Sequence, residues 1–225
     1  RDADAPPGVL RIGAQLTLGD RQARDGAGAW LLKSLTVFQQ GPAGMTALAA
    51  AGTFQDKELE NRQGLYRIDN TRWALQALEN PMPASEQPAL LFIHGTASST
   101  TGSFAELWKT SARSTLAERY GNRIYGFEHR TLTDSPIRNA LDLARALPER
   151  QTLHLISHSR GGMVGELLAR ANRLHSDPFT TDELASFARA GQTQPEDATL
   201  LAELGKVLQA KQLRIERFVR VAAPV

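Results

Sequence analysis

The sequence predicts an α/β fold: a mostly parallel sheet flanked by helices, with an amino-terminal antiparallel β extension and a helical insertion. Two observations support this fold class. Strand-like and helix-like segments alternate from residue 89 to the end of the chain, which is typical of a parallel sheet covered by helices. In addition, the expected strand at 90–93 is a continuous apolar run, as expected for a strand that is buried on both faces of such a sheet.

The amino-terminal region, residues 1–80, is expected to be rich in β-structure, because apolar and polar residues alternate in it. A proline-rich stretch follows and predicts a linker. The predicted elements are strands at 9–18, 30–38 and 65–69, a helix at 70–78 and the linker at 80–88.

The second region, residues 81–225, is expected to hold the α/β core. Ser135 followed by Pro136 predicts a helix start, because serine caps helices and proline suits their first position. A polar insertion at 175–212 carries one apolar stripe and is expected to be helical. The predicted elements are strands at 90–93, 123–127, 152–157 and 215–222, and helices at 103–120, 136–147 and 160–172.

Composition excludes several classes of function. The 225 residues include 26 Lys and Arg against 24 Asp and Glu, so there is no electrostatic basis for a nucleic-acid or anionic-membrane partner. No apolar run reaches the length of a transmembrane segment. The absence of cysteine excludes disulfides and thiol catalysis.

Without a signal-peptide pattern, a cytoplasmic location is favoured but not established. Because the chain begins with Arg1, we expect further domains in the same polypeptide.

The segment 155–162, Leu-Ile-Ser-His-Ser-Arg-Gly-Gly, carries the strongest chemical signal. It follows a strand and opens a helix, the setting in which a small-x-Ser-x-Gly pattern forms a sharp turn that exposes a nucleophile. Ser159 is expected at the apex in a strained backbone conformation, with Ser157 and Gly161 small enough for strand and helix to approach. The helix amino terminus favours developing negative charge. We therefore predict Ser159 as the nucleophile; the alternative is an inert serine in a plain turn.

A second signal is His94-Gly95-Thr96, directly after the strand at 90–93. A His-Gly turn ahead of a serine elbow is where an oxyanion-stabilising loop is expected, because Gly95 lets the backbone approach a ligand. We expect the backbone amides of Thr96 and Arg160 to donate to the oxyanion. The alternative is a glycine turn that only ends the strand.

Together the two motifs, Leu-Leu-Phe-Ile-His-Gly-Thr at 90–96 and the elbow at 155–162, resemble the α/β-hydrolase superfamily, and within it bacterial lipase- and esterase-like serine hydrolases. The resemblance covers residues 88–225, with Ser157 in place of the usual first glycine. It implies a serine hydrolase that acts on small-molecule or lipid carboxylic esters and needs no cofactor. The insertion would then either cover the pocket as a lid or form a surface excursion. Supporting positions carried over by the resemblance are His94, Gly95, His158 and Gly161.

The resemblance also implies the chain order serine, acid, histidine. Only His175 follows Ser159, and it comes too early in the fold to be the base. The histidine and the acid are therefore expected beyond Val225, which makes the hydrolase fold of this chain incomplete. The alternative is a catalytically inactive hydrolase-like domain that binds or regulates within a larger polypeptide.

The remaining titratable residues are expected to be structural or to line the pocket. His154 is expected to pack within its strand, whereas His129, Glu128 and Asp134 follow or end the strand at 123–127 and could line the site. The histidines lack the spacing of a metal site, and no glycine-rich phosphate loop is present. The sequence therefore predicts no metal and no cofactor.

Overall fold

A six-stranded sheet forms the centre of the computed structural model, which describes residues 62–173, 176–190 and 195–223. The strand order is β2-β1-β4-β3-β5-β6. β3 pairs in parallel with β4 and β5, and β5 pairs in parallel with β6, whereas β1 is antiparallel to both of its neighbours. The prediction of a mostly parallel sheet is confirmed. The strands are β1 (Gly64–Ile68), β2 (Leu75–Ala77), β3 (Ala89–Ile93), β4 (Ile124–Glu128), β5 (Thr152–His158) and β6 (Arg214–Val221).

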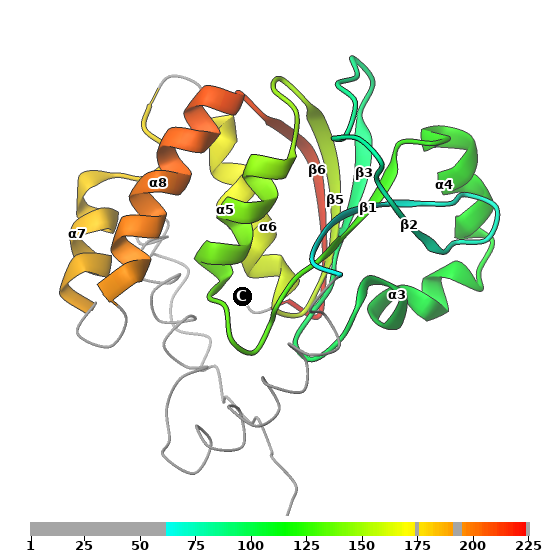
Figure 1. Ribbon diagram of the computed structural model, residues 1–225, viewed down its shortest axis with the longest axis horizontal. Helices are drawn as coiled ribbons and strands as arrows, with labels where there is room; N and C mark the ends of the chain where they lie inside the picture. Colours follow the sequence, from blue (N-terminus) through cyan, green and yellow to red (C-terminus); the bar gives the residue numbers. More distant parts are fainter. Residues whose placement is uncertain (1–61, 174–175, 191–194, 224–225) are drawn as a thin grey trace, which may run out of the picture.

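Helices cover both faces of this sheet (Figure 1). One face carries α5 (Pro136–Ala146) and α6 (Gly161–Ala169), with α7 (Thr181–Ala190) and α8 (Pro195–Lys211) packed outside them. The other face carries α3 (Thr100–Trp108) and α4 (Ala112–Tyr120). A short 3-10 turn, η1 (Arg170–Asn172), follows α6. Every residue of β3 and β4 is buried, as expected for strands between two helical layers.

The helix expected at 70–78 is wrong, because this segment forms a turn and then strand β2. The Asp69 carboxylate accepts hydrogen bonds from the amides of Thr71 and Arg72, both at 2.8 Å. A side chain that bonds to nearby amides in this way offers the backbone an alternative to a helix. Trp73 then adopts a φ of +58°, which closes the turn before β2.

The helix expected at 103–120 is two helices, α3 and α4, and α3 begins already at Thr100. The break lies at Thr110, whose hydroxyl donates to the Leu107 carbonyl at 2.7 Å and so takes up an acceptor at the end of α3. The start of α5 agrees with its prediction. Ser135 accepts a hydrogen bond from the Arg138 amide at 3.2 Å, and Pro136 occupies the first turn.

The insertion at 175–212 contains α7 and α8, and the apolar stripe of α8 packs onto α5. Leu201, Leu204 and Leu208 are buried there. At the amino-terminal side, β1 and β2 extend the same sheet beyond β4. The strands expected at 9–18 and 30–38 lie outside the described residues.

The connections of the sheet diverge at the carboxyl ends of β3 and β5, which are neighbouring strands. After β3 the chain leaves toward α3 on one face, and after β5 it leaves toward α6 on the other (Figure 1). Ligands of open α/β sheets bind where neighbouring connections diverge in this way. The loop at 94–96 and the turn at Ser159 are the two segments that border this point.

Candidate active site

Ser159 stands at the turn between β5 and α6 with a φ of +50°. This left-handed conformation is uncommon for a residue with a side chain and costs about 1–3 kcal/mol. Backbone hydrogen bonds hold it: the Ser159 amide donates to the Val221 carbonyl, and the Ser159 carbonyl accepts from the Gly162 amide, both at 2.9 Å. The strained backbone expected at the apex is confirmed, and Ser159 itself is half-buried.

The helix α6 begins in close contact with the end of β3. A Cβ added at Gly161 would lie 2.3 Å from the Ile93 carbonyl oxygen and 2.5 Å from that of His94. A Cβ added at Gly95 would lie 2.9 Å from the Ser159 Cβ. Only glycine fits these two positions without a shift of the backbone or of the serine, so the loop after β3 lies directly against the elbow.

Ser157 occupies the place where the usual elbow has its first glycine. Its side chain is completely buried, and its hydroxyl has no hydrogen-bond partner among the described residues. The site therefore accommodates a serine here, but leaves its polar atom unpaired.

The loop after β3 leaves one amide unused between two that are bonded. The Gly95 amide donates to the Ser103 hydroxyl at 3.4 Å, and the Ala97 amide donates to the Thr131 hydroxyl at 2.8 Å. The Thr96 amide between them donates to no described residue. Ala97 follows with a φ of +50°, which marks a second strained residue at this loop.

Across from this loop, the Arg160 amide is likewise without an acceptor among the residues that the structure describes. It follows Ser159 directly and precedes the first residue of α6. Unpaired amides beside a serine on a sharp turn are the kind of donor that can stabilise an oxyanion in acyl transfer. The geometry thus brings together Ser159, Gly95 and the backbone of Thr96 and Arg160.

His94 and His129 form a buried stacked pair, with ring centroids 4.1 Å apart. The Nε2 atom of His94 accepts from the His129 amide at 3.2 Å, so its Nδ1 carries the proton and donates to the Gly95 carbonyl at 3.0 Å. Nδ1 of His129 donates to the Phe127 carbonyl at 3.1 Å. Burial lowers the pKa of both imidazoles, that of His129 further than that of His94. Both rings are therefore neutral and support the loop.

Of the two candidate pocket carboxylates, Glu128 is buried and structural. Its Oε1 accepts from the amide of Thr100, the first residue of α3, at 2.7 Å. A carboxylate at a helix amino terminus stabilises the helix. Asp134 contributes its backbone carbonyl, which accepts a hydrogen bond from the Arg160 side chain.

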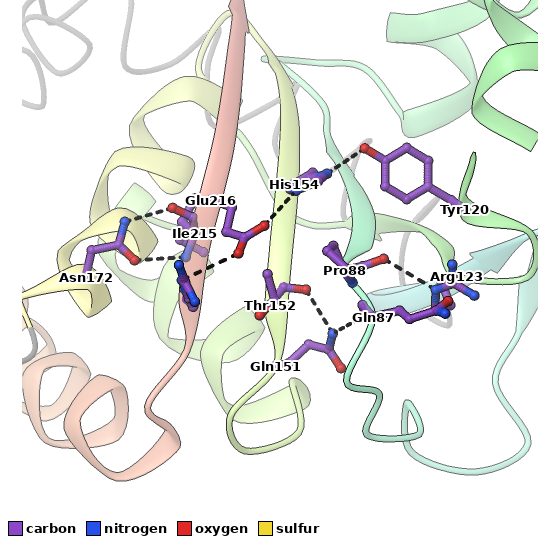
Figure 2. A network of polar contacts seen from close by, with 11 residues as sticks. Gln87, Pro88, Tyr120, Arg123, Gln151, Thr152, His154, Asn172, Ile215 and Glu216 are labelled. Carbon is purple, nitrogen blue, oxygen red and sulfur yellow. Dashed lines mark hydrogen bonds and ion pairs between the residues drawn. The ribbon is translucent and has the colours of Figure 1, made fainter.

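The other histidines lie in different surroundings. His158 is the last residue of β5, next to Ser159, and its Nδ1 has no partner among the described residues. His154 lies deep between α4, β5 and β6, where Nδ1 is 2.6 Å from the Tyr120 hydroxyl and Nε2 is 3.3 Å from Glu216 (Figure 2). This confirms His154 as a packed residue. His175 lies outside the described residues.

Sequence reasoning assigned a role only to the backbone of Arg160 and missed its side chain, which is buried. It also missed the hydrogen bond from the Ser135 hydroxyl to Asp197 of α8, at 2.7 Å. The capping pattern at Ser135 was a usable local signal. No local pattern marked Asp197, because it lies 62 residues from Ser135 in the sequence.

Other kinds of site are not prominent in the described part of the chain. Among the residues described, no cluster of three or more His, Cys, Asp or Glu side chains is suited to a metal ion. None of the helices described is both long and apolar enough for a bilayer crossing. A hollow lined by Ala171, Pro178 and Leu208 lies beyond the far end of α6, and no residue predicted for the site borders it.

Comparison with known families yields one match. The model of a domain of unknown function, DUF7379, matches residues 60–209, more than half of the chain. The match runs from the residues before β1 into α8 and includes both the loop at 94–96 and the elbow at Ser159. Neither the curated proteins nor the solved structures contain a match. On the extent of the family match, the chain belongs to the DUF7379 family.

Proposed function

We propose that this chain carries the nucleophile and the oxyanion site of a serine hydrolase that acts on carboxylic esters. The observation that carries the proposal is the strained backbone of Ser159, with a φ of +50°, on a strand-to-helix turn that contacts the glycine of a second loop. Local strain of this kind persists where the surroundings enforce it, and it is common at catalytic residues.

In the proposed reaction, the Ser159 hydroxyl oxygen attacks the ester carbonyl carbon as its proton passes to a general base, which later gives the proton to the leaving alcohol oxygen. The carbonyl oxygen becomes an oxyanion, which the amides of Thr96 and Arg160 receive. Collapse of the tetrahedral intermediate releases the alcohol and leaves an acyl-enzyme, which water then hydrolyses. Removal of one oxyanion donor typically lowers kcat by about 100- to 1000-fold, so two correctly placed amides would supply much of the rate.

The proposal needs a general base for Ser159. Among the described histidines, His94 uses both ring nitrogens in hydrogen bonds, and His129 stacks on it and bonds through Nδ1. Nε2 of His129 and Nδ1 of His158 are buried and have no partner among the described residues. His154 is bonded to Tyr120 and Glu216. The resemblance to α/β-hydrolases implies a base and an acid later in the polypeptide than Val225, and the proposal adopts that order.

The test is labelling with a fluorophosphonate probe, which phosphonylates activated serines, on the intact polypeptide that carries this chain. We expect one labelled peptide that contains Ser159, and no labelling of Ser159→Ala. Ser114→Ala is the matched control, because Ser114 is exposed on α4 and should not affect labelling.

An intact, folded polypeptide that stays unlabelled would contradict the proposal. That outcome would instead favour an inactive hydrolase-like domain that binds or regulates. Labelling at a serine other than Ser159 would also contradict the assigned nucleophile.

A further inference from the structure

Arg160 places a guanidinium in the protein interior, only 5% exposed. Its Nη2 donates to the carbonyl oxygen of Asp134, whereas Nη1 has no hydrogen-bond partner among the described residues. Burial of a cation costs several kcal/mol unless its partners compensate. An apolar side chain of similar length would fill this space without that cost, so packing alone does not explain an arginine here.

The guanidinium ties the elbow to the loop before α5, and that loop is in turn bonded to α8. Asp134 ends the loop between β4 and α5, and Ser135 next to it caps α5. The Ser135 hydroxyl donates to Asp197 in the first turn of α8 at 2.7 Å. Burial lowers the pKa of Arg160 to about 10, although the carboxylates of Asp134 and Asp197 oppose this shift. The side chain is therefore cationic at neutral pH, and it bonds the elbow to the loop that Ser135 links to α8.

The backbone amide of Arg160 is one of the two proposed oxyanion donors. The Arg160 amide directly follows Ser159, whose φ of +50° is not a conformation that a serine prefers. At Arg160 the backbone turns into α6, and no side chain caps that helix start. The orientation of the Arg160 N–H is set by the peptide group between Ser159 and Arg160. This peptide group has a strained residue on one side and a helix start without a side-chain cap on the other. Because the far end of the Arg160 side chain is anchored at the Asp134 carbonyl, rotation of this peptide group is limited.

We propose that Arg160 is a positioning residue, whose buried guanidinium is bonded to the Asp134 carbonyl and so tied, through the neighbouring Ser135, to Asp197 of α8. This anchor holds the Arg160 amide in line for the oxyanion. This inference rests on the proposed function. It also links the insertion to the reaction, because Ser135, next to the anchoring Asp134 carbonyl, bonds to Asp197 in the first turn of α8.

The experiment compares kcat and KM for a short-chain chromogenic ester in the intact polypeptide, with active sites counted by fluorophosphonate titration. Arg160→Met should lower kcat per active site by about 10- to 100-fold, because a displaced donor no longer meets the transition state. KM should change by less than about 2-fold, because the ground-state carbonyl depends little on this donor. Arg160→Lys should recover at least about 3-fold of the lost kcat, because one ammonium donor can reach the Asp134 carbonyl.

Arg170→Met is the matched control. Arg170, at the far end of α6, and Glu183 of α7 form another largely buried pair, with a 2.9 Å contact and side chains 14% and 11% exposed. This variant should lower the melting temperature and leave kcat per active site unchanged. A purely structural role of Arg160 would make the two methionine variants behave alike. If Arg160→Met does not fold, Asp197→Asn provides the second variant, with an expected fall in kcat of about 3-fold or more.

The outcomes separate the two proposals. If the unsubstituted polypeptide is labelled at Ser159 but Arg160→Met keeps kcat within about 2-fold, the positioning role is overturned and the proposed function stands. An Arg160→Lys variant no better than Arg160→Met, or an Asp197→Asn variant with unchanged kcat, also overturns it. If Ser159 is not labelled at all, the proposed function fails and the positioning role fails with it.

Discussion

At the scale of single residues, the sharp turn at Ser159 depends on neighbouring glycines, which have no side chain. The serine is held with a φ of +50°, and the cost of that conformation is offset by tight contacts that only glycines allow. Gly161 lies against the carbonyls of β3, and Gly95 lies against the serine itself. Ser157 is the exception, since it brings a hydroxyl into the interior without giving it a described partner. The strain and the close packing are two consequences of one sharp turn.

The glycine contact can be tested by Gly161→Ala. Its Cβ would lie 2.3 Å from the Ile93 carbonyl oxygen, a backbone atom that moves only if β3 moves. We expect the free energy of unfolding, measured by urea denaturation, to fall by about 1–3 kcal/mol.

Gly205→Ala is the matched control for this prediction. Gly205 lies inside α8, where a Cβ would meet the Phe179 ring at 3.4 Å, an ordinary contact. The helix should gain about 0.5–1 kcal/mol from this change. Equal stability of the two variants would contradict the close approach of α6 to β3.

At the scale of elements, a chain of polar contacts, buried at Tyr120 and His154 and exposed at Glu216, joins α4, β5 and the edge strand β6. Tyr120 ends α4, His154 lies in β5 and Glu216 lies in β6 (Figure 2). Asn172 adds a second tie, because its amide group both donates to and accepts from the backbone of Ile215. These contacts hold β6, whose outward residues are largely exposed, in register with β5. The Val221 carbonyl of β6 in turn receives the Ser159 amide.

Tyr120→Phe should weaken this fastening. It removes the hydroxyl 2.6 Å from Nδ1 of His154 and leaves that buried nitrogen without its partner. We expect a loss of about 1–3 kcal/mol in the free energy of unfolding, measured by thermal and urea unfolding. Tyr66→Phe is the control, because the Tyr66 hydroxyl bonds to no described residue and Tyr66 is only partly buried. A loss of the same size in Tyr66→Phe would contradict the role assigned to the Tyr120–His154 contact.

At the scale of the whole molecule, two helical layers and one sheet bring the site together from distant parts of the chain. The loop after β3 and the turn after β5 meet because those strands are neighbours in the sheet, although β4 and α5 come between them in sequence. The core on the α5 face extends into α7 and α8, which supply Phe187, Leu201 and Leu204. The insertion is therefore continuous with the main hydrophobic core.

The buried pair of His94 and His129 predicts how the free energy of unfolding depends on pH. Burial lowers the pKa of His94 and His129 in the folded chain from the ordinary value of 6.5. The unfolded chain therefore takes up protons first as the pH falls. The free energy of unfolding should be level above pH 7 and should decrease below about 6.5, by up to ~1.4 kcal/mol per pH unit for each histidine. Burial raises the pKa of Asp142 and Asp197, and these groups act in the opposite direction at lower pH.

The measurement is urea denaturation between pH 5 and 8, with His129→Asn as the comparison. Asparagine can still donate to the Phe127 carbonyl that His129 Nδ1 reaches, but it does not titrate. We expect a shallower decline below pH 6.5 in this variant. An identical decline in both proteins would show that His129 does not titrate differently in the folded and unfolded chains.

The sequence by itself determined the features that depend on neighbours along the chain. The Ser135-Pro136 start of α5, the buried strand β3 and the strained turn at Ser159 follow from local patterns, and all three are present. Local patterns failed at 70–78, where the Asp69 side chain bonds to the amides that follow it and favours a turn. There the apolar spacing indicated a helix, but side-chain hydrogen bonding prevailed.

Only the tertiary structure decided which distant groups meet. The stacking of His94 on His129 and the contacts that join Arg160 to Asp134 and Ser135 to Asp197 span 26 to 62 residues. They arise from the order of strands in the sheet and from the packing of α8 on α5. Periodicity and capping report on residues within a few turns of each other, whereas burial and pairing over such separations exist only once the layers have packed. For that reason Ser159 could be singled out from the sequence, and the support of its neighbouring amide could not.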